Sequence, residues 1–383
     1  MTNVNRILDL CNEFLEIPSS INYEKPFLNY LAKKANKLGY NISKKDDYLI
    51  IKPIINNNNS KHLFSIHIDR HAMIKNENEK IEYLAFYLKR KHNFNFKRDN
   101  MQDGEKNIVK QLKTDKYITN LGDKYFNIEK NNIKTRFIRE DGPDFYELIA
   151  NRHVGNTIYS YDNSGKKIKE HIILRCDSNY KTNLITFDIL NKIKKEEKIF
   201  SIKNKITKKK DYFFGQIDNV ISVAVIFYLL ETTNFQDEII FTTKEEISQS
   251  YKCVLDYCKN STNKKLIILD TSPFEKLEEY PKGFLVLRKG DEMGRFDIKL
   301  TNEILNYFIK NNIPYIFKPS NIGKTELGKI IYKTQGKING TTIQIPTKNY
   351  HTTYETSFIE NLQNYIKIIK KVSNYQQLKT KDY

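Results

Sequence analysis

The chain has 383 residues, 39% of them hydrophobic, which is enough for one large domain or two ordinary ones. No run approaches the roughly 18 apolar residues that a membrane span needs, and the amino-terminal segment has a helical pattern instead of a signal-peptide pattern. We therefore expect a cytoplasmic protein with no membrane partner. The four cysteines match no CxxC zinc pair, so reduced thiols are expected.

The net charge of +18, taken alone, indicates nucleic acid or an anionic surface as a partner. The lysines, however, are scattered along the chain, and lysine, asparagine and isoleucine are abundant together, as in a compositionally biased genome. The chain also carries no RRM-type or zinc-finger signature. Nucleic-acid binding is therefore the weakest of the functional hypotheses.

The first elements predict the start of an α/β sheet. Apolar residues at helical spacing predict a helix over 5–17, which Pro18 ends, and a second helix over 24–40. Two short β-type runs follow, at 48–55 and 62–69. Two helices and then two strands are typical of an α/β architecture.

A change of pattern predicts an inserted domain. From 71 to 205 the segments are short, β-rich and separated by Gly, Asn and Asp. From 206 onward helices and strands alternate again, and the chain closes with an amphipathic helix over 357–372. We therefore expect residues 1–70 and 206–383 to form one discontinuous α/β domain, interrupted by a small β domain of residues 71–205.

Polar residues at the ends of the predicted strands are the candidate site residues, because ligands of open α/β sheets bind beyond the carboxyl ends of the strands. The candidates, in chain order, are His67, Asp69, Asp218, Glu245, Glu246, Asp270 and His351.

Most of these candidates have a simpler explanation when taken singly. Asp218 precedes an apolar helix and suits a helix N-cap, and Asp270 suits an ordinary turn. His67 lies in an apolar run, which is typical of a hydrogen-bonded core histidine, and His351 suits a surface loop. Glu245 and Glu246 suit a solvated strand end.

The combination favours a metal site. Two histidines with several carboxylates and no cysteine are the ligand set of a hydrolytic dinuclear zinc, cobalt or manganese centre. Such a centre needs a bridging carboxylate, a terminal carboxylate and an imidazole for each ion, and one more carboxylate as a base. Neighbouring side chains on a strand point in opposite directions, so one of Glu245 and Glu246 is expected to bind metal while the other accepts a proton.

Five short segments, in this order, resemble the metal-site motifs of the tetrahedral and glutamyl aminopeptidases, a family of dinuclear metallopeptidases once mislabelled as endoglucanases. They are HID (67–69), IDN (217–219), FTTKEEI (241–247), IILDTSP (267–273) and PTKNYHTTYE (346–355). The resemblance implies a mixed-sheet aminopeptidase domain of the phosphorylase/hydrolase-like class, formed by 1–70 and 206–383. It also implies an inserted β-rich domain, 71–205, for oligomerisation and substrate access.

The resemblance further implies roles for the candidates. The metal ligands are His67, Asp218, Glu246, Asp270 and His351. Asp218 bridges two divalent ions, with zinc or cobalt first and manganese next. Glu245 is the general base, and Asp69 is a carboxylate that orients His67.

The chain departs from the family pattern around these motifs. Arg70 stands where the family has Glu, Val220 and Ser222 stand where it has Arg and Gly, and Ser248 replaces the glycine of its EEVG segment. The segment NIGKTELG, 321–328, resembles the family's GGTDAG. These changes bear on substrate preference, metal affinity and rate more than on the type of reaction.

The function implied by the resemblance is a cytosolic metal-dependent aminopeptidase that removes N-terminal residues from short peptides, through a metal-bound hydroxide with Glu245 as base. The family also implies a hollow homo-oligomer, such as a dodecamer. The alternatives are a catalytically weak or inactive metallopeptidase-like scaffold and, last, a basic nucleic-acid-binding protein.

Overall fold

The computed structural model describes residues 4–53, 60–91, 116–120, 153–162, 164–179, 182, 184–259, 265–274, 276–320, 323–373 and 375–377. The chain divides into two compact units. Unit 1 consists of residues 1–70 and 205–383, and unit 2 consists of residues 71–204.

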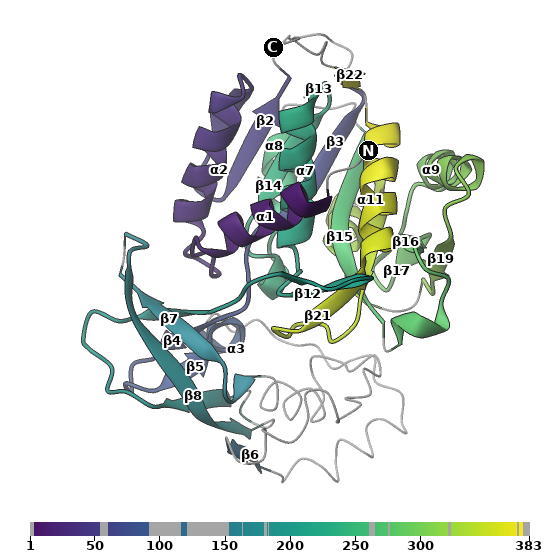
Figure 1. Cartoon of the computed structure of the whole chain (residues 1–383). Coiled ribbons are helices and arrows are strands. Elements are labelled where there is room, and N and C mark those ends of the chain that lie inside the picture. Colours follow the sequence, from purple (N-terminus) through teal and green to yellow (C-terminus); the bar gives the residue numbers. More distant parts are fainter. Residues whose placement is uncertain are drawn as a thin grey trace, which may run out of the picture. The chain divides into compact units, whose positions relative to one another are not determined.

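Unit 1 is built on an eight-stranded sheet (Figure 1). In spatial order its strands are β1 (Asn41–Lys44), β2 (Tyr48–Lys52), β14 (Glu238–Thr242), β3 (His62–His67), β15 (Lys265–Pro273), β20 (Gly340–Thr347), β16 (Leu285–Arg288) and β19 (Tyr315–Lys318). The central strands β14, β3, β15 and β20 run parallel, whereas β2 and β16 pair antiparallel with their neighbours β14 and β20. The predicted mixed α/β sheet is confirmed.

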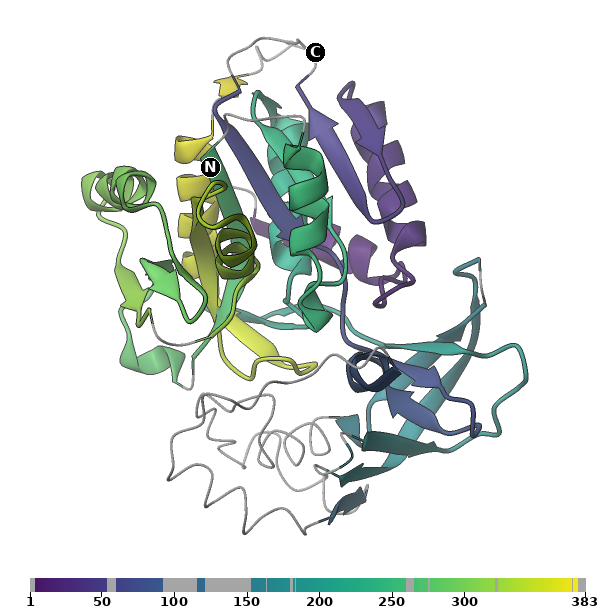
Figure 2. The ribbon, with the colours of Figure 1, turned by 180° about the vertical axis from the view of Figure 1, so that it is seen from behind.

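Helices cover both faces of this sheet. One face packs against α1 (Val4–Leu15), α2 (Lys25–Lys37), α7 (Val220–Thr232), α9 (Ile298–Lys310) and α11 (Ile359–Val372), and the other packs against α8 (Tyr251–Cys258) and α10 (Glu326–Thr334). Figures 1 and 2 show the two faces in turn. Successive side chains of a strand point to opposite faces, so each strand contributes to both layers. On β14, Ile239 and Phe241 pack with the helices of the first face, and Ile240 packs with those of the second.

Two details near the sheet edge differ from the expectations. Strand β14 ends at Thr242, so the prediction that Glu245 and Glu246 extend a strand is wrong. They lie in a 3-10 turn, η2 (Glu245–Ile247), which the left-handed backbone of Lys244, φ +65°, separates from the strand. Helix α10, which periodicity did not predict, begins where the side chain of Thr325 accepts a hydrogen bond from the Gly328 N–H.

Unit 2 is rich in antiparallel β-structure. It contains β4 (Ala72–Lys75), β5 (Ile81–Tyr83), α3 (Leu84–Lys91), β6 (Lys116–Asn120), β7 (Thr157–Tyr161), β8 (Lys167–Asn179), β9 (Leu184–Ile189) and β10 (Ile199–Ile202). The strand order is β6-β8-β7-β10-β4-β5-β9, and β9 also pairs with β8, which closes a ring. Closure leaves few unpaired strand edges among the described residues. A role for this unit in oligomerisation and substrate access stays a prediction.

Unit 1 also contains a small sheet, whose strands lie close in sequence to the candidate residues Asp218 and His351. It consists of β11 (Thr207–Lys208), β12 (Tyr212–Gly215) and β21 (Glu355–Phe358), and it pairs Gly215 with Glu355. A Cβ on Gly215 would lie 2.7 Å from the Ile206 Cδ1 and 2.9 Å from the Lys205 carbonyl oxygen. Only glycine fits there, so the end of β12 is held close against the chain that precedes it.

The remaining short elements are β13 (Thr233–Phe235), β17 (Gly290–Asp291), η3 (Leu277–Glu279), β18 (Gly294–Arg295) and β22 (Tyr375–Gln377). None of the helices that the structure describes is both long and apolar enough to cross a membrane.

Candidate metal and catalytic site

The candidate residues come from strands and loops at one edge of the eight-stranded sheet. His67 ends β3, and Asp270 lies on β15, which pairs with β3 in parallel. Asp218 lies just before α7, and His351 lies in the loop between β20 and β21. Parallel strands present their carboxyl ends at a common edge, which is how segments far apart in the sequence meet.

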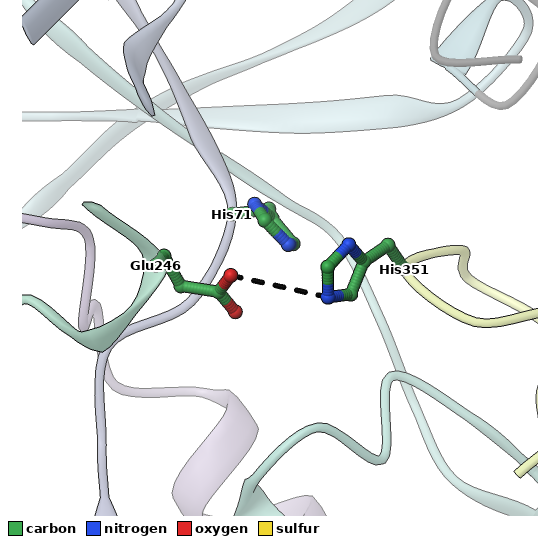
Figure 3. Close-up of side chains that lie close together, drawn as sticks. All are labelled: His71, Glu246 and His351. Atoms are coloured by element: carbon green, nitrogen blue, oxygen red, sulfur yellow. Dashed lines mark ion pairs between the residues drawn. The ribbon is translucent and has the colours of Figure 1, made fainter. Parts of the chain in front are cut away.

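The carboxylate of Asp218 lies between two imidazoles. Its Oδ1 is 3.2 Å from His67 Nε2, and its Oδ2 is 3.4 Å from His351 Nε2. Each imidazole also faces a second carboxylate: His67 Nε2 is 3.5 Å from Asp270 Oδ1, and His351 Nε2 is 3.9 Å from Glu246 Oε2. Figure 3 shows the Glu246 carboxylate directed at His351. The five predicted ligands thus form two groups of three that share Asp218.

Three of these side chains are buried, and their polar atoms fit a cation. His67 and Asp218 are each 4% exposed, and Glu246 is 8% exposed. Among the described residues, the buried atoms His67 Nδ1 and Asp218 Oδ1 have no partner with hydrogen-bond geometry. His67, Asp218 and Glu246 can offer ligand atoms that lie within 4.8 Å of one another. Imidazole nitrogens with carboxylate oxygens suit zinc, cobalt and manganese.

The electrostatics of the cluster also favour a bound cation. Burial opposes protonation of His67, but the nearby carboxylates of Asp218, Asp270 and Asp69 outweigh it and raise the pKa of His67 well above its usual range. Burial likewise opposes ionisation of Asp218, but His351 and His67 hold its pKa well below the usual value. The carboxylates around His67 thus favour a positive charge at this position, and a divalent ion would supply one.

Asp69 holds the glutamate turn in place. Its Oδ1 accepts a hydrogen bond from the Glu245 N–H and its Oδ2 accepts one from the Glu246 N–H, both at 3.0 Å. The same Oδ1 lies 3.7 Å from His67 Nδ1, which is longer than a hydrogen bond. The shortest contacts of Asp69 are therefore with the main chain of η2, a role that the sequence did not indicate.

The two glutamates differ in exposure. Glu246 is buried, and burial raises its pKa to about 8. Glu245 is only half-buried and lines a small pocket that is open to solvent. Burial, reinforced by Glu246 and Asp270, raises the pKa of Glu245 well above its usual value. The other residues that line this pocket are Ser248, Ser250, Tyr251, Met293, Lys324, Thr325, Glu326 and Lys329.

Glu355 is a residue that the sequence did not single out. Its Oε2 accepts hydrogen bonds from the N–H groups of Ile217, at 2.5 Å, and Asp218, at 2.7 Å, and its Oε1 accepts one from the His351 N–H at 2.7 Å. It ends the segment PTKNYHTTYE. A glutamate four residues after a histidine carries no signal of its own, because its partners are main-chain groups elsewhere in the chain.

Three departures from the family pattern have local structural partners. The Arg70 guanidinium donates to the carbonyl oxygens of Leu15 and Ile17. Ser222 Oγ lies 2.9 Å from Tyr365 Oη, inside the helical layer. Val220 is buried at the start of α7.

The fourth departure lies in a special backbone conformation. Ser248 has φ +55°, in the left-handed region that glycine occupies more readily. A non-glycine residue costs roughly 1–2 kcal/mol there. The glycine of the family's motif would avoid this cost, so Ser248 is a local source of strain beside the glutamate pair.

Thr325 and Glu326 occupy the Thr-Asp positions of the family's motif, and both are tied to the scaffold. Thr325 donates to Asp291 Oδ2 through its hydroxyl at 2.8 Å. Glu326 accepts hydrogen bonds from Ser65 Oγ at 2.8 Å and Thr242 Oγ1 at 3.1 Å, so it links β3 to β14.

Residues 194–368 match the family model of the M42 glutamyl aminopeptidases. The family resemblance is confirmed. The expected enzyme class, a peptidase, is confirmed with it. The matched range contains four of the five predicted ligands and both glutamates of the pair, whereas His67 and Asp69 lie before it.

Solved structures show the same fold at low sequence identity. An aminopeptidase from the archaeon Desulfurococcus kamchatkensis has a TM-score of 0.65 at 10% identity, covering 96% of this chain and 94% of its own. A TET aminopeptidase from a marine sediment archaeon of the Thaumarchaeota has a TM-score of 0.65 at 13% identity, covering 98% of both chains. The TET1 peptidase of Pyrococcus horikoshii has a TM-score of 0.60 at 14% identity, covering 96% of this chain and 99% of its own. No curated protein sequence matches the chain.

Proposed function

We propose that this chain is a metal-dependent aminopeptidase that removes residues from the amino termini of short peptides. The observation that carries the proposal is the Asp218 carboxylate between His67 and His351, at 3.2 Å and 3.4 Å, with a further carboxylate facing each imidazole. This arrangement supplies a bridging ligand and two terminal pairs, which is what a dinuclear hydrolytic centre needs.

The residues divide between two ions. His67 and Asp270 would hold one ion, Glu246 and His351 the other, and Asp218 both. Zinc or cobalt suits these ligands best, and manganese comes next. Divalent ions bound there would lower the pKa of coordinated water toward about 7 and polarise the scissile carbonyl.

Glu245 is the proposed general base. Its half-buried carboxylate lines a pocket, and Asp69 fixes its main chain through the hydrogen bond to the Glu245 N–H. In this role it takes the proton of the attacking water and passes it to the leaving amine. Burial raises the pKa of Glu245, which makes its carboxylate a stronger acceptor for the proton that it must hold between the two transfers.

Assembly follows from the relatives by analogy. The TET1 peptidase of Pyrococcus horikoshii is described as assembling into a tetrahedron or a large octahedral shell, and another matched TET1 structure is described as a dodecamer. We extend this to a homo-oligomer of the present chain, with unit 2 contributing to subunit contacts and to the access of substrate. Size-exclusion chromatography with light scattering tests the oligomer, and cytoplasmic location stays a prediction.

The test is a panel of aminoacyl substrates, assayed on protein reconstituted with zinc, cobalt or manganese, with the Glu245→Gln variant alongside. Loss of the base is expected to lower hydrolysis by about 10²- to 10⁴-fold while metal binding is retained. Glu279→Gln is a matched control, because Glu279 is an exposed residue that pairs only with Lys276 among the ion pairs described.

The outcomes separate the alternatives. Unchanged hydrolysis by Glu245→Gln would exclude Glu245 as the base. Wild-type protein that binds two ions but hydrolyses none of the substrates would favour the inactive scaffold. Polynucleotide binding that weakens steeply between about 50 and 200 mM salt would favour the nucleic-acid hypothesis.

A further inference from the structure

Glu355 links two of the predicted metal ligands through their main chains. It is 0% exposed, and its two oxygens accept three backbone N–H groups. Two of these donors, on Ile217 and Asp218, lie 138 and 137 residues away in sequence, and the third belongs to His351. One carboxylate therefore joins the segment that carries the bridging ligand to the loop that carries a terminal ligand.

The His351 loop adopts a conformation that needs support. Both Asn349, φ +58°, and His351, φ +59°, lie in the left-handed region that side chains other than glycine avoid. Backbone hydrogen bonds between Lys348 and Thr356, both at 2.9 Å, close the loop at its base. Inside the loop, Glu355 Oε1 accepts the His351 N–H and so stabilises the strained residue itself.

The Asp218 segment depends on the same carboxylate. Asn219, the N-cap residue of α7, makes no side-chain capping bond, and its Nδ2 instead donates to the Leu269 carbonyl at 2.9 Å. The N–H groups of Ile217 and Asp218 point the other way, to Glu355 Oε2. Pairing of Gly215 with Glu355 in the small sheet fixes the carboxylate at a defined distance from this segment.

We propose that Glu355 is a positioning residue that sets the spacing between Asp218 and His351, and thereby the affinity of the metal ion held by Asp218, Glu246 and His351. This inference rests on the proposed function. Of the ligands of the other ion, His67, Asp270 and Asp218, only Asp218 is hydrogen-bonded to Glu355 among the contacts described. Loss of Glu355 should therefore weaken one metal site more than the other.

The chemistry of the side chain explains why an amide cannot replace it. A carboxylate has two acceptor oxygens, whereas glutamine has one acceptor oxygen and an NH₂ group that only donates. In Glu355→Gln, that NH₂ would face either the His351 N–H or the N–H pair of Ile217 and Asp218. One of the two segments would then lose its acceptor. Glu355→Asp keeps both acceptors on a shorter side chain.

The test measures metal binding directly. Full-length protein is stripped of metal and titrated with Co²⁺, while calorimetry gives the number of ions bound and visible absorption reports their coordination. Wild type is expected to bind two ions. In Glu355→Gln, one ion should bind with affinity close to wild type and the other about 10- to 100-fold more weakly, the usual effect of removing an outer partner of a ligand. Glu355→Asp should lie between the two.

A matched control separates this effect from damage to the fold. Glu197→Gln removes a buried acid of unit 2 that is also 0% exposed, and it should leave both Co²⁺ affinities unchanged. Two ions bound at wild-type affinity and with an unchanged spectrum in folded Glu355→Gln would overturn the proposal. If Glu355→Gln fails to fold, the same result for Glu355→Asp would overturn it.

Different results would overturn this inference and the proposed function. Wild-type protein that binds two ions without cleaving peptides would overturn the proposed activity, and the Co²⁺ titration of the variants would still decide the role of Glu355. Wild-type protein that binds no ion would overturn both.

Discussion

Each unit buries histidine against acidic side chains, but the balance of charge differs. In unit 2, His171 on β8 and Glu197 are both 0% exposed at the side chain, and His171 Nε2 lies 2.9 Å from Glu197 Oε2. In unit 1, the imidazoles of His67 and His351 face the carboxylates of Asp218, Glu246 and Asp270.

The pKa shifts reflect this difference. In unit 1, burial raises the pKa of Glu246 to about 8, and neighbouring carboxylates such as Asp218 contribute to the rise. In unit 2, burial lowers the pKa of His171, and the single charge of Glu197 opposes that shift. In unit 2 one carboxylate faces one imidazole, whereas in unit 1 three carboxylates face two imidazoles, and the proposed cations would offset this excess of negative charge.

The largest expected effect comes from the shared ligand. Asp218→Asn should lower the hydrolysis of peptide substrates by on the order of 10³-fold or more. Both proposed ions would lose a ligand, and together the ions would contribute several kcal/mol of transition-state stabilisation. Steady-state kinetics and metal analysis by mass spectrometry measure both effects. Asp256→Asn is the control: Asp256 pairs with Lys45 at the surface at 2.7 Å, and such pairs contribute little. Full activity of Asp218→Asn would contradict the view that the unit 1 cluster is a metal site and the His171–Glu197 pair of unit 2 a structural one.

Removal of metal should lower the stability of unit 1 and leave the stability of unit 2 unchanged. A metal that binds only the folded chain stabilises it by about 2.7 kcal/mol when its concentration is 100-fold above Kd. Hydrogen exchange should therefore slow on addition of Zn²⁺ around Asp218 and at the start of α7, and should stay unchanged in β8. Equal slowing in β8 would show that the metal also acts on the His171 cluster.

Breaking the unit 2 pair should reduce stability without changing metal binding. Glu197→Gln leaves His171 buried without a charged acceptor, which should lower the free energy of unfolding by about 1–3 kcal/mol. Hydrogen exchange in β8 and β10 measures the loss within unit 2. A lower metal content in this variant would contradict the separation of the two clusters.

The smallest expected effect is a pH dependence of unit 2. Because burial lowers the pKa of folded His171, the unfolded chain binds a proton first as the pH falls. Stability should thus be complete above about pH 6.5, the usual histidine pKa, and decline below it until the folded pKa is reached. Hydrogen exchange in β8 across this range checks the prediction, and His171→Gln should flatten the curve. A loss of stability above pH 7 would have the wrong sign.

The sequence predicted those features that depend on local patterns. Apolar periodicity located most of the sheet strands, though not β1 or β16, and the long helices. Polar residues at the ends of apolar runs located His67, Asp270 and the glutamate pair. Asp218 and His351 were candidates on the same ground, because each follows a predicted strand. The structure brings all five predicted ligands together, although their roles stay proposals.

The missed features depend on long-range or special backbone geometry. The 3-10 turn of Glu245 follows from a left-handed Lys244, a conformation that nothing in a lysine indicates. The role of Glu355 depends on amide groups that lie 137 and 138 residues away. The two-residue strand β11 is too short to give an alternation pattern.

The place of β3 in the sheet has a consequence for synthesis of the chain on the ribosome. This strand carries His67, and its two sheet neighbours, β14 and β15, begin at Glu238 and Lys265, after the whole of unit 2 has been made. At about 5–20 residues per second, β3 waits on the order of ten seconds or more for a partner. During that interval an apolar strand is open to wrong pairing, so unit 1 depends on late folding or on chaperone protection in a way that unit 2 does not.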